Sequence, residues 1–387
     1  MNAILTWFGA ISLCAAVAGA QPTPHYTVTD LETLGGPGTT SVAFQMNNAG
    51  WVSGGSNLTP GGPQHAFLWL GHGSLIDLGT LEGSACPGCN SGGDGPNGSG
   101  AVAVGSEISR TDPNGEDFCG FGTHAVCRGA VWNNGILKAL PNLPGGNNAN
   151  AFGINSRGEV VGFAENGTSD TSCLDGGTPF QVVQFEAVKW GANGAIQQLR
   201  PLPGDAVGYA FGLNDNGEVI GASGLCSNTA IPPFPNGPHA VLWESDGTPR
   251  DLGNLGIPGF AVASSINNRG DVVGGALAQD GTVHGFLWTR QTGMQDLGGF
   301  PGAIVTTAVC CHTISDNGQV VGFSIDGTTF ASRAIVWEGK VPVDLNTLIP
   351  ADSGWYLQST ASVNNLGEIV GWGTIGGNTH AFLLRPR

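Results

Sequence analysis

Hydrophobic and polar positions alternate in short runs that are separated by glycine-rich turns. Residues 262–266 read VASSI, residues 267–270 read NNRG, and residues 271–274 read DVVG. Alternation with a period of two is typical of β-strands, and Asn and Gly tolerate the positive φ angles that a tight hairpin turn needs. Two further runs follow, HGFLW at 284–288 and a last one that ends at 296–297. The pattern therefore predicts four short antiparallel strands within about fifty residues.

The same unit recurs along the chain in seven copies. Each copy has a DLG-like segment, an N-x-x-G-x-V-V-G segment and an HAFLW-like segment. The DLG-like segments start at Asp30, Asp77, Ala139, Gln198, Asp251, Asp296 and Asp344. The turn segments start at Asn47, Asn155, Asn214, Asn267, Ser315 and Asn364, and the HAFLW-like segments end at Trp69, Trp132, Trp190, Trp243, Trp288, Trp337 and Leu384. In the second copy we interpret residues 101–105 as a worn remnant that lacks the Asn turn.

Four antiparallel strands every fifty residues are typical of a β-propeller blade. A β-solenoid is the alternative, but its coils are usually shorter. The first strand-like segment, at 25–31, matches a fourth strand, and the last, at 380–384, matches a third strand. Pairing of these two segments would remove open sheet edges. The sequence thus predicts an all-β, seven-bladed β-propeller of four-stranded blades, closed by the N-terminal strand pairing with the C-terminal blade.

Composition and charge narrow the classes of protein that fit. Glycine accounts for 66 of 387 residues, charged residues for 11 %, and lysine for three positions, which argues against a helical bundle or coiled coil. A hydrophobic content of 40 % is too high for a disordered chain. The net charge of −16 argues against nucleic-acid and anionic-lipid partners. It is compatible with divalent cations or with solubility outside the cell.

The N-terminal twenty residues have the features of a secretory signal peptide. An apolar run at 4–18 is too short to span a bilayer and precedes the small-residue site Ala18-Gly19-Ala20, although no Lys or Arg precedes the run. Cys14 follows Leu13, which argues against a lipoprotein anchor. We expect cleavage after Ala20 and no membrane span in the mature chain. Residues 21–387 are then a single monomeric domain, secreted to the extracellular space or held in the periplasm.

The three segments together resemble the HAF repeat of predicted secreted bacterial proteins. The resemblance covers residues 25–387 and rests on elements such as HAFLW at 65–69 and INNRGDVVG at 266–274. It implies export and repetition, with no established activity. The copies occupy approximately residues 30–76, 77–138, 139–197, 198–250, 251–295, 296–343 and 344–387.

Every large insertion is expected on one face of the propeller, the face of the inter-blade and second-to-third-strand connections. We call it the long-loop face, and its insertions are residues 82–100, 106–127, 163–184 and 222–238. Loops of this length in a compact domain are usually functional or disordered. The carboxylates on them are candidate ligand-binding residues, namely Asp94, Asp112, Glu116, Asp117, Asp170 and Asp175, with Glu107 and Glu165 beside them. No metal site is assigned.

Eight cysteines remain after the signal peptide, and six of them lie on these insertions: Cys86, Cys89, Cys119, Cys127, Cys173 and Cys226. In an exported chain they are disulfide candidates, although spacing does not define connectivity. Cys119–Cys127 is the favoured pair, and Cys173–Cys226 would join adjacent loops. A redox role for Cys86 and Cys89 lacks a thioredoxin-like context. A zinc site at these cysteines would need a second ligand pair near it, for which His124 and Cys127 are the candidates.

Residues that repeat from copy to copy are interpreted as structural. His65, His239, His284 and His380 occupy one repeat position, whereas a catalytic base is needed only once per site. The non-repeating tryptophans, Trp51, Trp355 and Trp372, are candidates for stacking on sugars. Turns 214–217 and 315–318 lack the full calcium-loop pattern and are read as hairpins.

The function predicted from these observations is a secreted, non-enzymatic binding scaffold that uses the long-loop face of repeats two to four. Its expected partner is a polysaccharide, a cell-envelope component or a protein, with no cofactor. The alternatives are a carbohydrate-active hydrolase or lyase, since paired carboxylates can cleave glycosides, and a purely structural surface protein. No G-x-S-x-G, Walker or H-E-x-x-H motif is present, and no catalytic residue is assigned.

Overall fold

The computed structural model describes residues 25–174, 181–229 and 238–387. The signal peptide predicted at 1–20 lies outside the described residues. The described chain is built of strands with four short helical turns, so the predicted all-β class is confirmed. The turns are η1 (Gly83–Ala85), η2 (Thr171–Leu174), α1 (Cys226–Thr229) and η3 (Leu345–Thr347). None of these helical turns has the length or the apolar character that would be needed to cross a bilayer.

Within the described residues the strands form five four-stranded antiparallel sheets and one eight-stranded sheet. The first two sheets along the chain are β2 (Ser41–Met46), β3 (Val52–Asn57), β4 (Gln64–Trp69) and β5 (Ile76–Gly79), then β6 (Ser91–Asp94), β7 (Val102–Thr111), β8 (Ala125–Asn133) and β9 (Ile136–Ala139). The next two are β10 (Ala149–Ile154), β11 (Val160–Ser169), β12 (Val183–Trp190) and β13 (Ile196–Leu199), then β14 (Val207–Leu213), β15 (Val219–Gly224), β16 (His239–Trp243) and β17 (Pro249–Asp251).

The eight-stranded sheet combines two successive groups of four strands. They are β18 (Ala261–Ile266), β19 (Val272–Leu277), β20 (Val283–Thr289) and β21 (Gly293–Asp296), followed by β22 (Ala303–Thr307), β23 (Val320–Asp326), β24 (Ser332–Glu338) and β25 (Val341–Asp344). The groups join because the start of β20 pairs in parallel with β22, through Val283 and His284. The remaining interactions of β20 are antiparallel, with β19 and β21.

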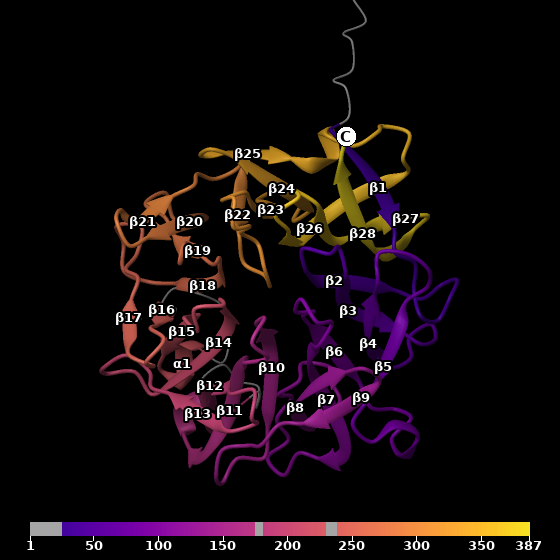
Figure 1. The fold of residues 1–387 in the computed structure, drawn as a ribbon. Helices are drawn as coiled ribbons and strands as arrows, with labels where there is room; N and C mark the ends of the chain where they lie inside the picture. The colour runs from indigo at the N-terminus through magenta and orange to yellow at the C-terminus, as the bar shows by residue number, and fades with distance from the viewer. Residues whose placement is uncertain (1–24, 175–180, 230–237) are drawn as a thin grey trace, which may run out of the picture.

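The last sheet brings together both ends of the described chain. It consists of β26 (Trp355–Val363), β27 (Ile369–Ile375) and β28 (Asn378–Pro386), with β1 (Tyr26–Asp30) as the fourth strand. Strand β1 pairs antiparallel with β28, so that Tyr26 lies opposite Pro386 and Asp30 lies opposite Phe382. Figure 1 shows the sheets side by side around a ring, with the first strand of each toward the centre.

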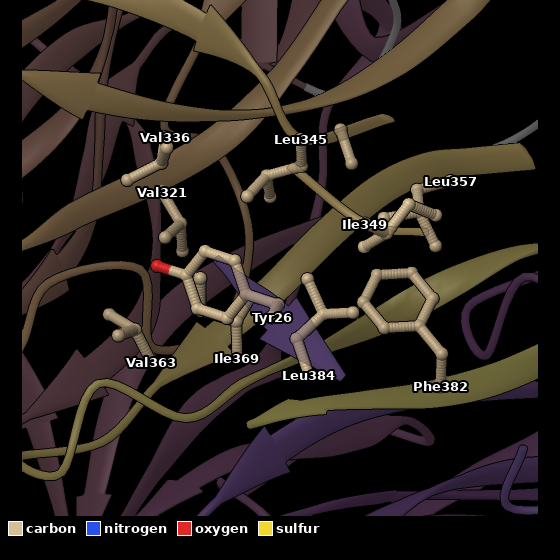
Figure 2. Close-up of a cluster of buried hydrophobic side chains, with 11 residues drawn as sticks. Tyr26, Val321, Val336, Leu345, Ile349, Leu357, Val363, Ile369, Phe382 and Leu384 are labelled. Carbon is tan, nitrogen blue, oxygen red and sulfur yellow. The ribbon is translucent and has the colours of Figure 1, made fainter. Parts of the chain in front are cut away.

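Apolar side chains fill the space between neighbouring sheets. Tyr26 of β1 is buried among side chains of the C-terminal sheets, including Leu345, Ile369 and Phe382 (Figure 2). Two of the repeated tryptophans also donate to the segment that leads into their own sheet from the preceding one: Trp190 to the carbonyl of Pro141 at 2.8 Å, and Trp243 to the carbonyl of Arg200 at 2.7 Å. The core is therefore distributed around the ring, as the recurring HAFLW segments require.

The last glycine of the N-x-x-G-x-V-V-G segment lies against a bulge in the first strand of its sheet, which leaves no room for a side chain. At Gly162 an added Cβ would lie 1.9 Å from the carbonyl oxygen of Asn150, beside the register shift between Ala151 and Gly153. In the second copy the corresponding position is Val104. There β6 pairs with β7 without a register shift, so a side chain is tolerated.

The expectation that the second copy lacks an Asn turn is wrong. The Asn97 side-chain oxygen accepts hydrogen bonds from the backbone N–H groups of Ser99 and Ala101, as Asn155 does from Arg157 and Glu159. Asn97-Gly98-Ser99-Gly100 fits the N-x-x-G pattern, but it was counted within the insertion 82–100. That range also contains β6, and residues 106–111 and 163–169 extend β7 and β11, so these insertions are partly strand.

The turn asparagines also link successive sheets on the face opposite the long loops. Each side-chain amide donates to the backbone carbonyl of the corresponding residue in the next copy. The links are Asn47 to Asn97, Asn97 to Asn155, Asn155 to Asn214, Asn214 to Asn267, Asn267 to Ser315, and Asn364 to Asn47, at 3.0 to 3.5 Å. Ser315 has no amide to reach Asn364. The repeat thus encodes a turn and an inter-sheet contact with one residue.

Candidate functional site

A cavity of about 550 Å³ lies where the first strands of several sheets converge. Its walls include Phe44 of β2, Phe152 of β10 and Phe211 of β14, and the 112–124 connection between β7 and β8 adds Phe121. We call this space the axial cavity. Because the 112–124 connection is one of the predicted insertions, the cavity lies on the long-loop side of the ring.

The lining of the axial cavity is mainly aromatic, with a few polar groups. Phe152 packs edge-on to Phe211, with ring centroids 5.8 Å apart, and stacks on Phe163 at 5.4 Å. Polar atoms come from residues that interrupt this surface: Gln64, Asp94, Asn150 and Ser264. A ligand with an apolar face and hydrogen-bonding edges fits such a lining, since apolar walls with few polar groups are usual in ligand sites.

Among the candidate carboxylates that the structure describes, Asp94 is the one that lines the axial cavity. It belongs to β6 and is 9 % exposed, so its expected place on a surface loop is wrong. Burial raises the pKa of Asp94 to about 7, although a hydrogen bond with Cys311 lowers it in part. A carboxyl group with this pKa can hold or release a proton near neutral pH.

Cys310 and Cys311 complete one wall of the axial cavity. Their Sγ atoms lie 2.8 Å apart, and both are free thiols. The hydrogen bond from Cys310 and burial raise the pKa of Cys311 well above its usual value. The Cys311 thiol is therefore a protonated neighbour of Asp94 at neutral pH.

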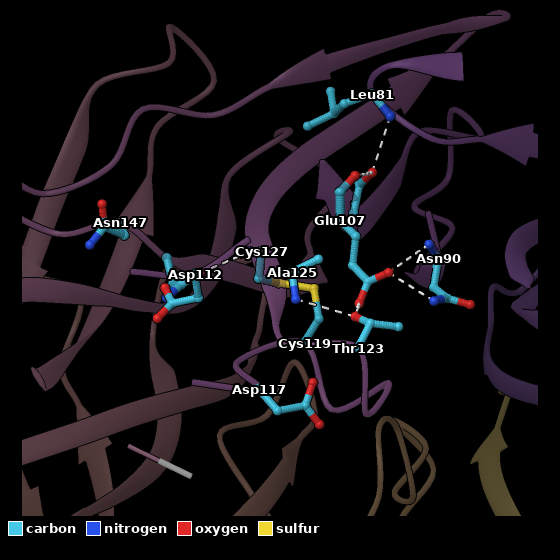
Figure 3. The surroundings of a disulfide bond; sticks show 12 residues. Leu81, Asn90, Glu107, Asp112, Asp117, Cys119, Thr123, Ala125, Cys127 and Asn147 are labelled. Carbon is cyan, nitrogen blue, oxygen red and sulfur yellow. Dashed lines mark hydrogen bonds between the residues drawn. A yellow bond between two sulfur atoms is a disulfide. The ribbon is translucent and has the colours of Figure 1, made fainter. Parts of the chain in front are cut away.

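Three disulfides hold the long-loop connections. The structure pairs Cys119 with Cys127, Cys173 with Cys226, and Cys86 with Cys89. Figure 3 shows the Cys119–Cys127 bond beside Glu107, which accepts hydrogen bonds from the backbone and side chain of Asn90. Cys127 is not available as a zinc ligand.

The remaining candidate carboxylates separate into different roles. Asp112 and Glu116 come together with Glu165 in a buried cluster. Asp117 accepts a hydrogen bond from the Gly122 N–H within its own connection. Hydrogen bonds from Gln184 and Ser172 lower the pKa of Asp170, which anchors its loop. Asp175 lies outside the described residues.

The aromatic wall was missed from the sequence, but a signal for it exists. Phe44, Phe152 and Phe211 each stand three residues before a turn asparagine, and so do Asp94 and Ser264. This repeat position points into the cavity in five copies. The tryptophans proposed for sugar stacking are elsewhere: Trp51 and Trp355 pack on apolar clusters, and Trp372 lies edge-on to Phe44.

No protein-family model matches the sequence, and no curated protein matches it either. Solved structures do match. The chain is similar to puromycin hydrolase, with TM-score 0.53, 13 % identity, and coverage of 95 % of this chain and 56 % of that one. It is also similar to an oligogalacturonate lyase in complex with manganese, with TM-score 0.51, 11 % identity, and coverage of 95 % and 98 %.

A third match is the β-propeller domain of the Trilobed protease from Pyrococcus furiosus, with TM-score 0.45, 8 % identity, and coverage of 76 % and 82 %. The arrangement of the sheets themselves, antiparallel and side by side around a ring, is that of a β-propeller (Figure 1). At these identities the likeness concerns the fold alone. The chain spans just over half the length of puromycin hydrolase.

Proposed function

We propose that the chain is an exported, non-enzymatic binding module that holds its ligand at the axial cavity on the long-loop face. The observation that carries this proposal is the aromatic wall of Phe44, Phe121, Phe152 and Phe211 around a cavity of about 550 Å³. The four rings come from four separate segments of the chain and leave an apolar surface that nothing in the described chain fills. Apolar cavities with a few convergent polar groups are typical of ligand sites.

The scaffold in this proposal is a seven-bladed propeller of HAF-type repeats, closed by β1. Seven sequence copies and the antiparallel pairing of β1 with β28 support it. The signal-peptide features of residues 1–20 and the three disulfides support export, since disulfides persist in oxidising compartments.

The chemistry of the cavity favours a ligand with flat apolar faces and hydroxyl or amide edges. Sugar rings of a polysaccharide have this character, and so do some groups of cell-envelope components and proteins. The net charge of −16 argues against a strongly anionic polymer.

The test compares two phenylalanine variants of the purified chain. Phe121→Ala removes a ring that lines the cavity, whereas Phe330→Ala removes a 70 % exposed ring on the β23–β24 connection, outside the cavity lining. Binding is measured on immobilised neutral polysaccharides and on envelope fractions. We expect F121A to weaken retention at least ten-fold and F330A to behave as wild type. Equal retention by F121A and wild type would overturn the proposal.

One observation favours a second function, a carbohydrate-active hydrolase or lyase. Asp94 lines the cavity and has a pKa raised to about 7 by burial, which suits a general acid or base. In this case incubation with a polysaccharide releases sugar products, and Asp94→Asn abolishes their release while retention persists. Product release by the wild-type chain would replace the binding module with the enzyme.

A further inference from the structure

Three carboxylates from two neighbouring parts of the ring meet on the long-loop face. Asp112 and Glu116 lie on the connection between β7 and β8, and Glu165 lies on β11. One oxygen from each residue lies within 4.8 Å of one oxygen from each of the other two. Asp112 is 4 % exposed, and Glu116 and Glu165 are fully buried. The cluster is therefore separate from the axial cavity and from bulk solvent.

Backbone N–H groups fix one oxygen of each carboxylate. The donors are Asn114 and Glu116 for Oδ1 of Asp112, Asn147 and Asn148 for Oε2 of Glu165, and Val182 and Val183 for Oε1 of Glu116, at 2.5 to 3.1 Å. Each carboxylate is thus oriented by two hydrogen bonds. The second oxygen of each one is left to face the cluster.

The second oxygens of Asp112 and Glu165 share a single side-chain donor. The Asn148 amide nitrogen donates to Oδ2 of Asp112 at 2.8 Å and to Oε1 of Glu165 at 2.7 Å. The Asn148 oxygen accepts from the backbone N–H of Cys127, which fixes the orientation of the amide. Oε2 of Glu116 is buried and has no hydrogen-bond partner. A buried carboxylate oxygen without a partner is costly unless a proton or a cation compensates it.

Within the described residues no side-chain cation pairs directly with the cluster, although Arg128 of β8 interacts electrostatically with Glu165. Burial and the neighbouring Glu165 carboxylate raise the pKa of Glu116. The three close carboxylates and the unpartnered Oε2 of Glu116 need a proton or a cation to compensate them.

We propose that Asp112, Glu116 and Glu165 bind one divalent cation, and that this cation is calcium. Oxygen-only donors suit hard cations, and calcium tolerates irregular coordination in which water completes the shell, whereas magnesium requires near-ideal octahedral geometry. Two other groupings of possible ligands, around Cys86–Cys89 and Cys173–Cys226, consist of one carboxylate and a disulfide. Disulfide sulfurs are poor ligands, so among the groupings found in the described residues only the three-carboxylate cluster has this chemistry.

The bound calcium would join the 112–124 connection to the neighbouring sheet. That connection also carries Phe121 and the Cys119–Cys127 disulfide. Calcium would therefore hold one wall of the axial cavity in place. The site itself does not depend on which ligand the cavity binds, so it goes beyond the proposed function.

The experiment uses the purified chain, stripped of metal with EDTA and titrated with calcium chloride at pH 7.5. Isothermal titration calorimetry gives the stoichiometry and Kd, and thermal unfolding gives the shift in Tm. The variant is Glu116→Gln. Its matched control is Glu186→Gln on β12, which removes a lone buried glutamate that also has an unpartnered oxygen.

We expect wild type and E186Q to bind one calcium ion with a rise in Tm, and E116Q to bind at least 100-fold more weakly. Asp112→Asn serves as a second variant if E116Q does not fold, with the same expected loss. Absence of calcium-dependent heat and of a Tm shift in wild type would overturn the proposal in favour of a proton at the cluster. Wild-type calcium affinity in the variants would also overturn the proposal. A Tm shift with magnesium chloride but not with calcium chloride would do the same.

Discussion

His380 and Asp30 are 350 positions apart in the chain, yet Nδ1 of His380 lies 2.9 Å from Oδ2 of Asp30. The same two repeat positions pair within single sheets, His65 with Asp77 at 2.8 Å and His284 with Asp296 at 2.9 Å. The N-terminal strand thus supplies the aspartate that the C-terminal copy lacks. The recurring histidines are one half of a contact between the third and fourth strands.

His239 departs from this pattern, because its partner is a different aspartate. Its Nδ1 lies 3.0 Å from Oδ2 of Asp205, on the segment that enters β14. Asp251 accepts from the Gly253 N–H, just as Asp77 accepts from the Gly79 N–H. At His65 the hydrogen bonds from the histidine and from Gly79 N–H outweigh burial and lower the pKa of Asp77. These contacts are exposed or half-buried, so each is expected to contribute little to stability on its own.

The pairing of β1 with β28 predicts that Tyr26 is important for stability. Tyr26 is 9 % exposed within the terminal cluster of Figure 2, whereas Tyr356 on β26 of the same sheet is 41 % exposed. We expect Tyr26→Ala to lower the free energy of unfolding by about 3–5 kcal/mol, as for other buried aromatic residues, and Tyr356→Ala to have a much smaller effect. Urea unfolding measures both. An unchanged Tm after deletion of residues 21–31 would contradict the proposed closure.

Ser315 lacks the side-chain amide that links the turn asparagines to the next sheet, so an asparagine at this position is expected to stabilise the fold. Ser315→Asn keeps an acceptor for the Gln319 N–H and adds an amide that can reach the carbonyl of Asn364, as the other turn asparagines do in their copies. We expect a gain of about 1 kcal/mol, the usual net contribution of one hydrogen bond. Asn267→Ser is the reciprocal control and should cost a similar amount. A loss of Tm in S315N would show that the turn does not accept the larger side chain.

The disulfides are expected to stabilise the fold to different extents, because they close loops of different lengths. Cys173–Cys226 spans 53 positions and Cys119–Cys127 spans 8. Chain-entropy arguments give about 4 kcal/mol for the first and about 2.5 kcal/mol for the second. Double Cys→Ser variants, compared by urea unfolding, should follow this order, with Cys86/Cys89 lowest. A larger loss for Cys119/Cys127 would mean that contacts of the 112–124 connection outweigh chain entropy.

The raised pKa of Asp94 predicts a pH dependence of stability. The unfolded carboxyl titrates near pH 4 and the folded one at about 7, so the native state binds the extra proton between these values. The contribution of Asp94 to stability therefore falls as pH rises from 4 to 7 and is constant above 7. We expect wild type to lose more stability than Asp94→Asn between pH 5 and 7.5, as measured by urea unfolding in saturating calcium. Parallel profiles for the two proteins would contradict this assignment.

Local chemistry explains why much of the fold was predictable. The N-x-x-G turns, the alternating strands and the conformational demands at positions such as Gly162 depend on residues close in sequence, so they recur in each copy. Asn97 was overlooked because glycine-rich insertion sequence surrounds it. The His–Asp contact was not foreseen, since strand register decides which side chains face one another.

The sequence by itself determined the all-β class, the strand order within each copy and the match between the first and last strand segments. These features follow from periodicity and turn chemistry, which act over a few residues. Only the tertiary structure decided that Phe44, Phe152, Phe211 and Asp94 face a common cavity, and that Asp112 and Glu116 meet Glu165. Such groupings join separate copies, and their burial, and with it the raised pKa values of Asp94 and Glu116, exists only once the sheets stand side by side.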